Sequence, residues 1–171
     1  MTSDLLLEAI VARLQPVGDN DLIVSLLTAE RGRVDAWVRA GRKSSRRFGG
    51  RLELFRAGVA RLRPGRGQMP SLAGLEGTRQ LLAPGVGYGG LCLASYAAEL
   101  ALIAAQPEHA DAQLATWLPR ALAAVATAEH DALATDRLAI EITFLGAAGW
   151  MPATADCNHC GAPLAAGAAW P

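Results

Sequence analysis

The chemistry that this 171-residue sequence suggests most strongly is phosphate binding by arginine. The window 31–66 holds 12 basic residues against two acidic ones, a net charge of +10, and only one of the chain's 16 basic residues is lysine. The planar guanidinium of arginine pairs with two phosphate oxygens at once and stacks on bases. A GC-rich genome also favours arginine codons, but a merely solvated surface would mix the two signs of charge more evenly. We therefore predict a nucleic-acid surface made of Arg33, Trp37, Arg39, Arg42, Lys43, Arg46, Arg47 and Arg51.

Two aromatic residues accompany these cations. Trp37 alternates with apolar residues, so we expect it to share the outer side of a strand with Arg39, where it either stacks on a base or packs against the second half of the chain. The segment Gly41–Gly50 is expected to be a basic loop. Phe48 lies inside this basic loop next to Gly49-Gly50, which marks a tight turn, and we expect it to pack in the core. No pattern suited to reading base edges occurs, so little sequence preference is expected.

A pair of cysteines near the end of the sequence, in Cys157-Asn158-His159-Cys160-Gly161, has the spacing of one half of a zinc knuckle. A structural zinc needs four ligands and this pair supplies two, so zinc binding is expected only if a second ligand pair exists. A thioredoxin-like redox pair is the alternative, but it needs a βαβ setting that the sequence does not offer. The remaining cysteine, Cys92, is expected to be a small buried hydrophobe on a helix.

The formal charge of zero hides an asymmetry between the two halves of the chain. Residues 1–81 hold 14 basic and 8 acidic residues, a net +6, whereas residues 82–171 hold 2 basic and 8 acidic residues, a net −6. This asymmetry indicates a nucleic-acid or acidic-partner surface on the first half. The acidic half is either a partner surface or a plain solvated exterior.

Several classes of protein are excluded by what the sequence lacks. It contains no P-loop, no G-x-G-x-x-G and no G-x-S-x-G motif, and its three histidines lie in no acid–base setting, so we predict no catalytic residues and no enzyme. The N-terminus has no positively charged segment of a secretory signal. The most apolar stretch, 91–105, contains Glu99 and is shorter than the roughly 20 residues that span a bilayer. A cytoplasmic protein is therefore expected.

The first half of the chain has the pattern of five short strands. The clearest alternation places Val34, Ala36, Val38 and Ala40 on one side and Asp35, Trp37 and Arg39 on the other. A tight turn at Glu30-Arg31-Gly32 precedes it, with Gly32 available for positive φ. The other strands are expected at Leu5–Leu14, Leu22–Thr28, Leu52–Arg63 with a bulge at Gly58, and Leu72–Leu82. Five strands without long crossovers predict a small antiparallel barrel of the OB-fold type over residues 1–82.

The second half, residues 83–171, reads as an all-α domain after a glycine-rich linker at Pro84–Gly90, so the fold class is α+β with the strands first. Leu91–Gln106 is apolar nearly all round and predicts a buried helix. Glu108–Glu129 carries Leu114, Trp117, Leu118, Ala121, Leu122 and Val125 at helical spacing, with Pro119 expected to kink or split it. Asp131–Ala148 predicts a third helix, with Gly149 as the C′ residue just after it.

The order of these features resembles the RecO family of DNA repair proteins. The resemblance rests on Gly18-Asp19-Asn20-Asp21-Leu22-Ile23-Val24-Ser25-Leu26-Leu27-Thr28, on Glu30-Arg31-Gly32, and on Arg39-Ala40-Gly41-Arg42-Lys43-Ser44-Ser45-Arg46-Arg47-Phe48. The helix start Tyr96-Ala97-Ala98-Glu99-Leu100 and the later order of Gly149-Trp150 and the cysteine pair also match. The likeness runs over essentially the whole chain and depends on the ordered set rather than on one motif.

The resemblance implies an N-terminal OB-fold, a helical domain and, in many members, a zinc-binding element. It further implies a recombination mediator that binds single- and double-stranded DNA, anneals complementary strands and, with its partner RecR, helps load the RecA recombinase onto DNA covered by single-strand-binding protein, SSB. The acidic tail of SSB is implied as a partner of the helical region, and the bacterial nucleoid as the location. Zinc-bearing relatives have a second cysteine pair downstream, so a chain that stops at Pro171 is expected to be interrupted. A protein-interaction module or an RNA-binding OB module without annealing activity is the alternative function.

Overall fold

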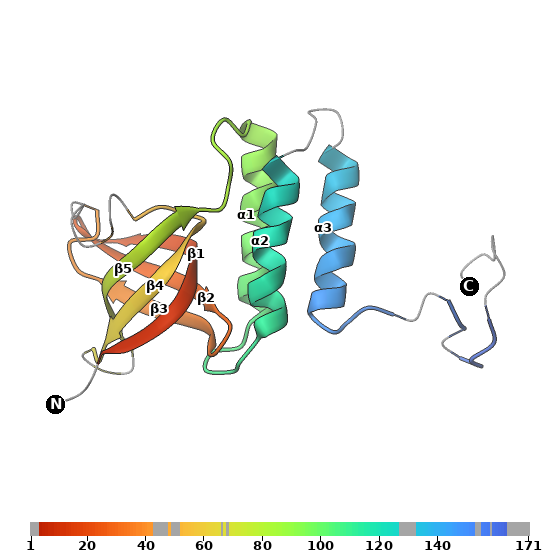
Figure 1. Ribbon diagram of the computed structural model, residues 1–171, viewed down its shortest axis with the longest axis horizontal. Coiled ribbons are helices and arrows are strands. Elements are labelled where there is room, and N and C mark those ends of the chain that lie inside the picture. The colour runs from red at the N-terminus through yellow and green to blue at the C-terminus, as the bar shows by residue number, and fades with distance from the viewer. Residues whose placement is uncertain are drawn as a thin grey trace.

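Strands occupy the first half of the chain and helices the second, in the arrangement shown in Figure 1. The computed structural model describes residues 4–42, 48, 52–65, 67, 69–126, 133–152, 155–157 and 159–163. The elements in these ranges are β1 (Leu5–Val17), β2 (Asp21–Thr28), β3 (Gly32–Val38), β4 (Arg56–Arg63), β5 (Ser71–Gln80), α1 (Tyr88–Ala104), α2 (Ala112–Ala126) and α3 (Leu133–Ala147).

The five strands close into a barrel in the order β1-β2-β3-β5-β4. All pairs are antiparallel except β3 with β5, which meet in parallel where Trp37 pairs with Ser71. The barrel interior is filled by side chains that alternate along each strand, among them Val24, Leu26, Ala36 and Leu72, each fully buried. The predicted fold class, a five-stranded OB-type barrel followed by helices, is confirmed.

The strand limits differ from the prediction in places where the backbone turns. β3 ends at Val38, so Arg39 and Ala40 are not strand residues as the alternation suggested, because Ala40 adopts a left-handed φ of 51°. β4 begins only at Arg56, because Phe55 before it also has a positive φ, 63°. The predicted bulge at Gly58 is confirmed by a register shift between Ala57 and Val59 in the pairing of β4 with β5.

Helices α1 and α2 lie against the barrel, and α3 lies on their far side (Figure 1). One apolar cluster joins the barrel to the helices, with Ile10, Leu27 and Phe55 from the barrel side packed against small residues of α1 and the apolar face of α2. The six α2 residues predicted from their spacing are all buried, and α2 continues through Pro119 as one helix instead of splitting.

The prediction that α1 is buried all round is wrong, because one of its faces is open to solvent. Leu91 is 44% and Ile103 is 73% exposed. Cys92 is exposed as well and is not the buried hydrophobe that was expected. The barrel, α2 and α3 cover only part of the circumference of α1, which the composition of the helix alone does not reveal. In the described part of the chain, no helix is long and apolar enough to cross a membrane.

Helix α3 ends at Ala147, and Gly149, the residue predicted to follow the C-terminus of the helix, has a positive φ of 73°. The backbone N–H of Trp150 donates to Leu145 O at 2.8 Å and that of Gly149 donates to Gly146 O at 3.2 Å, which is the Schellman pattern. Ile140 and Phe144 face the other helices, whereas Leu138 and Ile142 on the opposite side of α3 are 54% and 44% exposed.

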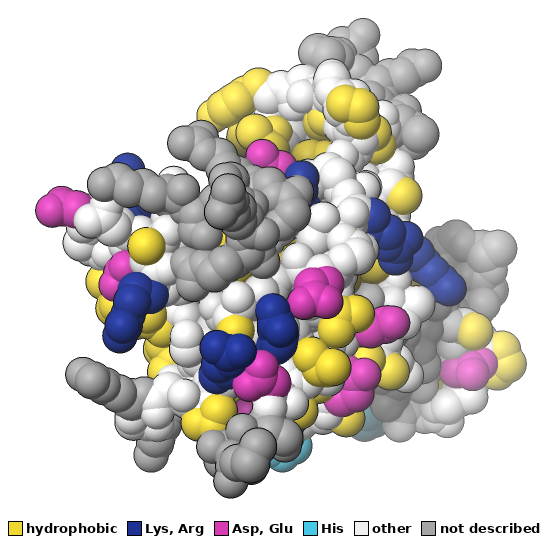
Figure 2. All heavy atoms as spheres, turned by 60° about the vertical axis from the view of Figure 1, so that its left-hand side comes forward, with side chains coloured by type: hydrophobic (Ala, Val, Ile, Leu, Met, Phe, Trp, Pro, Cys, Tyr) yellow, Lys and Arg dark blue, Asp and Glu magenta, His cyan; other side chains and the backbone are white. Residues whose placement is uncertain are grey.

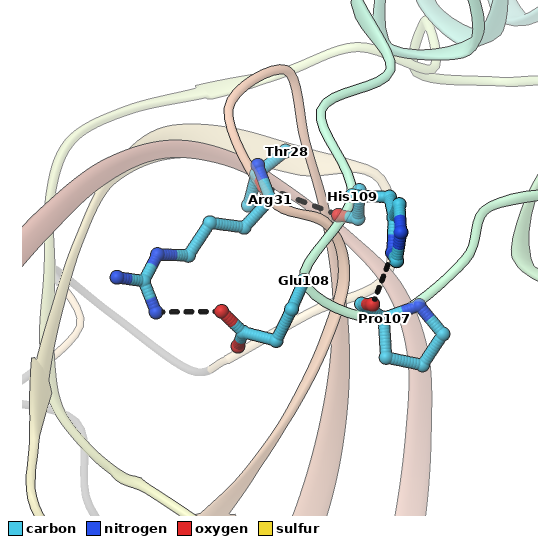
Figure 3. Close-up of polar contacts among 6 residues, drawn as sticks. Thr28, Arg31, Pro107, Glu108 and His109 are labelled. Carbon is cyan, nitrogen blue, oxygen red and sulfur yellow. Dashed lines mark hydrogen bonds and ion pairs between the residues drawn. The ribbon is translucent and has the colours of Figure 1, made fainter.

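The loop between α1 and α2 docks on the turn between β2 and β3 and fixes the helices to the barrel (Figure 3). An Arg31 guanidinium nitrogen lies 2.8 Å from Glu108 Oε2, and the Asp111 backbone N–H donates to Ala29 O at 2.9 Å. Gly32 has the predicted positive φ, 58°, and its α-carbon faces the carbonyl of His109. The Asp111 carboxylate then accepts the Leu114 N–H at 2.9 Å, which caps the N-terminus of α2.

Candidate nucleic-acid interface

The predicted nucleic-acid residues fall into three sets in the structure. Trp37, Arg39 and Arg42 lie together at the end of β3 that faces the turn 18–20. Arg33 lies at the other end of β3, four residues from Trp37, or about 13 Å along a strand. The remaining predicted residues, Lys43, Arg46, Arg47 and Arg51, are outside the described residues. We call residues 19–21 together with 37–42 the Trp37 rim.

Trp37 is half-buried on the outer face of the barrel, opposite the interior side occupied by Ala36 and Val38. Its indole N–H donates to Asp21 Oδ2 at 3.1 Å, and its backbone N–H donates to Pro70 O at 2.8 Å. Trp37 belongs to neither of the two buried apolar clusters, including the one that joins the barrel to the helices. One part of its indole is thereby tied to a carboxylate, and the exposed remainder is available for contact with a ligand.

Asp21 also holds the backbone that leads into the basic loop. Its Oδ1 accepts the N–H of Ala40 at 2.7 Å, the residue with left-handed φ. The Arg42 backbone N–H donates to Asn20 O at 3.1 Å, and the Arg42 guanidinium donates to Asp19 O at 3.3 Å. Arg39 and Arg42 are exposed. The turn before β2 therefore sets the direction in which residues 39–42 leave the barrel.

Phe48 anchors the basic loop to the barrel from within. It is fully buried in the cluster that fills the barrel interior, so the predicted core packing is confirmed and base stacking by this ring is not available. Its backbone carbonyl accepts a hydrogen bond from the Arg56 guanidinium at 3.5 Å, and Arg56 also lies 3.6 Å from the Glu53 carboxylate. The start of β4 thus supports the loop through a cation that is mostly buried.

Arg33 is engaged with its neighbour Asp35. Its Nε and a terminal nitrogen lie 3.0 and 2.7 Å from Asp35 Oδ2. Burial alone raises the pKa of Asp35, but hydrogen bonding from Arg33 and the nearby Ser25 hydroxyl, with the charges of Arg33 and Arg13, outweighs it and leaves that pKa lowered. The Asp35 carboxylate therefore offsets the charge that Arg33 could offer to a phosphate.

The basic residues outside the rim are interspersed with acids, as Figure 2 shows for the barrel side of the molecule. Arg13 pairs with Glu99, Arg61 with Glu76, and Arg63 with Asp4. Exposed pairs of this kind contribute little stability, but they lower the local field that a phosphate would experience. The Trp37 rim places the exposed Arg39 and Arg42 beside a half-buried aromatic ring.

The helices cover the opposite end of the barrel's outer face. Leu27 and Thr28 at the end of β2 are each only 1% exposed, and Gly32 lies against the α1–α2 loop. An OB-fold ordinarily binds its ligand across the face of strands 2 and 3. Here the helices cover the end of that face at Leu27 and Thr28, whereas Arg33, Asp35 and Trp37 on β3 remain partly exposed.

A groove of about 810 Å³ between α2 and α3 is a second candidate surface. Trp117, Ala121 and Val125 line it from α2, and Ile140 and Ala147 line it from α3, so its walls are mainly apolar. Two charged residues lie at these walls: Arg120 on α2, which forms no ion pair with a described residue, and Asp136 on α3. This arrangement suits an apolar segment that carries a carboxylate close to Arg120.

The cysteine pair forms a tight loop after α3. The Gly161 N–H donates to Cys157 O at 2.8 Å, and the Cys157 N–H donates to Ala162 O at 2.8 Å. Backbone N–H groups of Cys160 and then His159 point at the Cys157 sulfur and lower the pKa of that thiol. These features fit half of a zinc knuckle, but the described residues contain no group of three or more metal-binding side chains. They do not by themselves complete a four-ligand zinc site.

A closed five-stranded barrel of the OB type, followed by the helices α1, α2 and α3, defines the structural class of this chain. Comparison with known families agrees with this class. The family model described as Recombination protein O N terminal matches residues 1–81, and the one described as Recombination protein O C terminal matches residues 88–171. The chain belongs to the RecO family of DNA repair and recombination proteins.

Individual relatives named DNA repair protein RecO align with most of this chain. It is 37% identical over 164 residues to the DNA repair protein RecO of Anaeromyxobacter dehalogenans, and 39% identical over 171 residues to that of Anaeromyxobacter sp. strain Fw109-5. The RecO of Bifidobacterium adolescentis is 32% identical over 173 residues. These matches cover 94%, 96% and 95% of this chain but only 63%, 64% and 66% of the relatives, so the chain spans under two thirds of their length.

Two residues of the candidate surfaces were missed by reasoning from sequence. Asp21 was named only within the stretch 18–28 that carries the family resemblance, although its two oxygens accept hydrogen bonds from Trp37 and Ala40. Arg120 stood out in the sequence as one of two cations in an acidic half, but its place in a groove depends on how α2 and α3 pack.

Proposed function

We propose that this protein is a recombination mediator that binds single- and double-stranded DNA with little sequence preference and anneals complementary strands. With RecR it helps load RecA onto DNA coated by SSB, and it acts in the bacterial cytoplasm at the nucleoid. The observation that carries the DNA-binding part is the Trp37 rim, where a half-exposed indole stands beside exposed Arg39 and Arg42 at the root of the basic loop. Phosphates then meet arginine, and a base stacks on the open part of the ring.

The position of the rim supports a short contact on the barrel itself, continued by the basic loop. The helices cover the β2–β3 face at Leu27 and Thr28 and leave Trp37 partly exposed. Lys43, Arg46, Arg47 and Arg51, which lie outside the described residues, follow in the sequence and continue the run of cations. A surface made mostly of guanidinium groups and one ring contacts features that all bases share, which favours the proposed lack of sequence preference.

The α2–α3 groove supports the proposed contact with the tail of SSB. Its apolar walls fit the apolar residues of an acidic peptide, and Arg120 offers a cation without a described ion-pair partner to a carboxylate. The Asp136 carboxylate on the opposite wall disfavours a second negative charge there, so the peptide carboxylate should lie on the α2 side. An acidic peptide should therefore bind less tightly to an Arg120→Ala variant.

Two alternative functions, a protein-interaction module and an RNA-binding module, can be distinguished from DNA binding by experiment. In a pure protein-interaction module, the basic surface would recruit an acidic protein and contact with DNA would be incidental. In an RNA-binding module, the 2′-hydroxyl would raise affinity for RNA over DNA of the same sequence. Contact with phosphates is common to DNA and RNA, so only a direct comparison of the affinities for the two separates these functions.

The test of the proposal is strand annealing, measured with two complementary labelled oligonucleotides. The chain should accelerate annealing, and a variant with Arg42, Lys43, Arg46 and Arg47 replaced by alanine should lose most of the acceleration. A control variant with Arg120 and Arg137 replaced by alanine removes cations from the helical domain and should anneal like the original chain. No acceleration by the unmodified chain at about 50 mM salt, with acidic-peptide binding retained, would instead support the interaction module.

A further inference from the structure

Asp21 occupies an unusual place for an acidic residue, at the centre of a surface proposed to bind a polyanion. A carboxylate there repels phosphate, so a purely electrostatic view predicts that its removal improves binding. The hydrogen bonds that Asp21 accepts indicate a structural role instead. Both oxygens accept hydrogen bonds from parts of the rim: Oδ2 from the Trp37 indole at 3.1 Å and Oδ1 from the Ala40 backbone N–H at 2.7 Å.

These two bonds fix groups that neither strand geometry nor core packing would fix. Trp37 lies on the outer face and belongs to neither buried cluster, so the indole N–H bond helps set the orientation of its ring. Ala40 has a left-handed φ of 51°, a conformation that costs free energy for a residue with a Cβ. The charge-assisted bond to Asp21 compensates for that cost and directs the chain from Val38 toward Arg42.

The contacts of the neighbouring residues Gly41 and Arg42 also hold this segment against the barrel. The Gly41 N–H donates to Val38 O at 3.2 Å, and a Cβ on Gly41 would lie 2.8 Å from a Val38 methyl group. The Arg42 N–H donates to Asn20 O at 3.1 Å, in the turn 18–20 directly before Asp21. The Trp37 ring, Ala40 and Arg42 are thus all hydrogen-bonded to residues 19–21.

We propose that Asp21 is a positioning residue for DNA binding: it holds the Trp37 ring and the start of the basic loop in the orientation that receives a single strand. This inference rests on the proposed function of the rim. It predicts that the loss of a negative charge at position 21 weakens DNA binding, which is the opposite of the electrostatic expectation.

The experiment compares single-stranded DNA binding by the original chain and by Asp21→Asn, Asp21→Ala and Asp19→Asn. Asp19→Asn is the matched control, since it removes one exposed carboxylate from the same turn while its backbone carbonyl still accepts from Arg42. Asp21→Asn keeps the shape but presents an amide NH₂ to one of two donors, and Asp21→Ala loses both bonds. We expect both Asp21 variants to bind at least about threefold more weakly, since part of a base-stacking contact is lost, and Asp19→Asn to bind equally or more tightly.

A second readout separates positioning from general damage to the fold. The Trp37 indole N–H resonance, assigned with Trp37→Phe, should shift and exchange faster with solvent in Asp21→Asn but not in Asp19→Asn. The effect of Asp21→Asn on affinity should also shrink when Trp37 is already alanine. If the original chain binds DNA and Asp21→Asn binds as tightly as Asp19→Asn, the positioning role is wrong while the proposed function stands. If the original chain does not bind single-stranded DNA at about 50 mM salt, both are wrong.

Discussion

The α-carbon of Gly32, in the turn between β2 and β3, faces the backbone carbonyl oxygen of His109 in the loop between α1 and α2. A Cβ at position 32 would lie 2.5 Å from that oxygen and would also collide with Gln106 O. Both obstacles are backbone atoms, which cannot rotate away as a flexible side chain can. With the Arg31–Glu108 ion pair at 2.8 Å beside it, this close approach makes the β2–β3 turn the joint between barrel and helices (Figure 3).

Replacing Gly32 by alanine should therefore destabilise the protein by more than backbone strain alone. Gly18 provides the matched control, because its φ of 57° nearly equals the 58° of Gly32 and open space surrounds it. We expect Gly18→Ala to lower the free energy of unfolding by about 1 kcal/mol and Gly32→Ala by about 2–4 kcal/mol, measured by urea denaturation. Equal losses in the two variants would show that the joint has room for a methyl group.

Replacement of Trp37 should weaken single-stranded DNA binding. Base–aromatic stacking is worth about 1–3 kcal/mol per base, so Trp37→Ala should raise the dissociation constant by roughly 5- to 150-fold, and Trp37→Phe, which keeps a ring, should raise it less. Tyr88→Ala is the control, because Tyr88 is an aromatic residue 84% exposed at the start of α1 and distant in sequence from the rim. Affinity unchanged in Trp37→Ala would remove the indole from the binding surface.

The Arg33–Asp35 pair should make stability depend on pH in a defined direction. The pKa of Asp35 is lowered in the folded protein: burial raises it, but Arg33 and the other partners lower it more. A lowered pKa stabilises the fold above the unfolded pKa of about 3.9, and this contribution is lost as pH falls through the lower folded value. Asp35→Asn should therefore cost about 1–2 kcal/mol at pH 7, and the difference from the original chain should shrink below about pH 4.

Urea denaturation between pH 2.5 and 7 measures this difference, and Asp19→Asn controls for the loss of one exposed carboxylate. A gap between Asp35→Asn and the original chain that widens toward low pH would contradict the assigned direction of the Asp35 shift.

The cysteine loop should not hold zinc tightly with the residues of this chain alone. Cys157 and Cys160 provide two ligands, and the described residues contain no cluster of three. A site with two protein ligands leaves the ion to complete its coordination with water, whereas structural zinc uses four protein ligands. Elemental analysis after dialysis against zinc and gel filtration should find well under one zinc per chain. One zinc per chain that disappears in Cys157→Ser would require ligands beyond this pair.

Sequence patterns predicted the elements well where one face of an element is buried and the other is not. The spacing of Leu114, Trp117 and Leu118 identified the packed face of α2, and the alternation from Val34 to Val38 identified the barrel interior. The same reasoning failed for α1, because an apolar helix gives no sign of which face its neighbours will leave open, and Ile103 and Cys92 are exposed.

The candidate site was only partly predictable, because the sequence gives the number of arginines but not the partners that folding brings to them. Charge density located the basic segment, since the number of arginines is a property of the sequence itself. Which of them remain available depends on partners brought together by folding, such as Asp35 for Arg33. The link between Asp21 and Trp37 joins residues 16 positions apart through the pairing of β2 with β3, and only the register of those strands brings them within 3.1 Å.

The central claim is that the Trp37 rim and the basic loop bind DNA through its phosphates, and the salt dependence of single-stranded DNA affinity tests it most directly. If about 4–6 phosphates are neutralised, log K should fall with log[salt] at a slope of about −3 to −4, at roughly 0.7 per contact. The variant with Arg42, Lys43, Arg46 and Arg47 replaced by alanine should have a markedly flatter slope, whereas the Arg120→Ala/Arg137→Ala control should keep the original one. A slope that is unchanged in the fourfold variant would contradict the assignment.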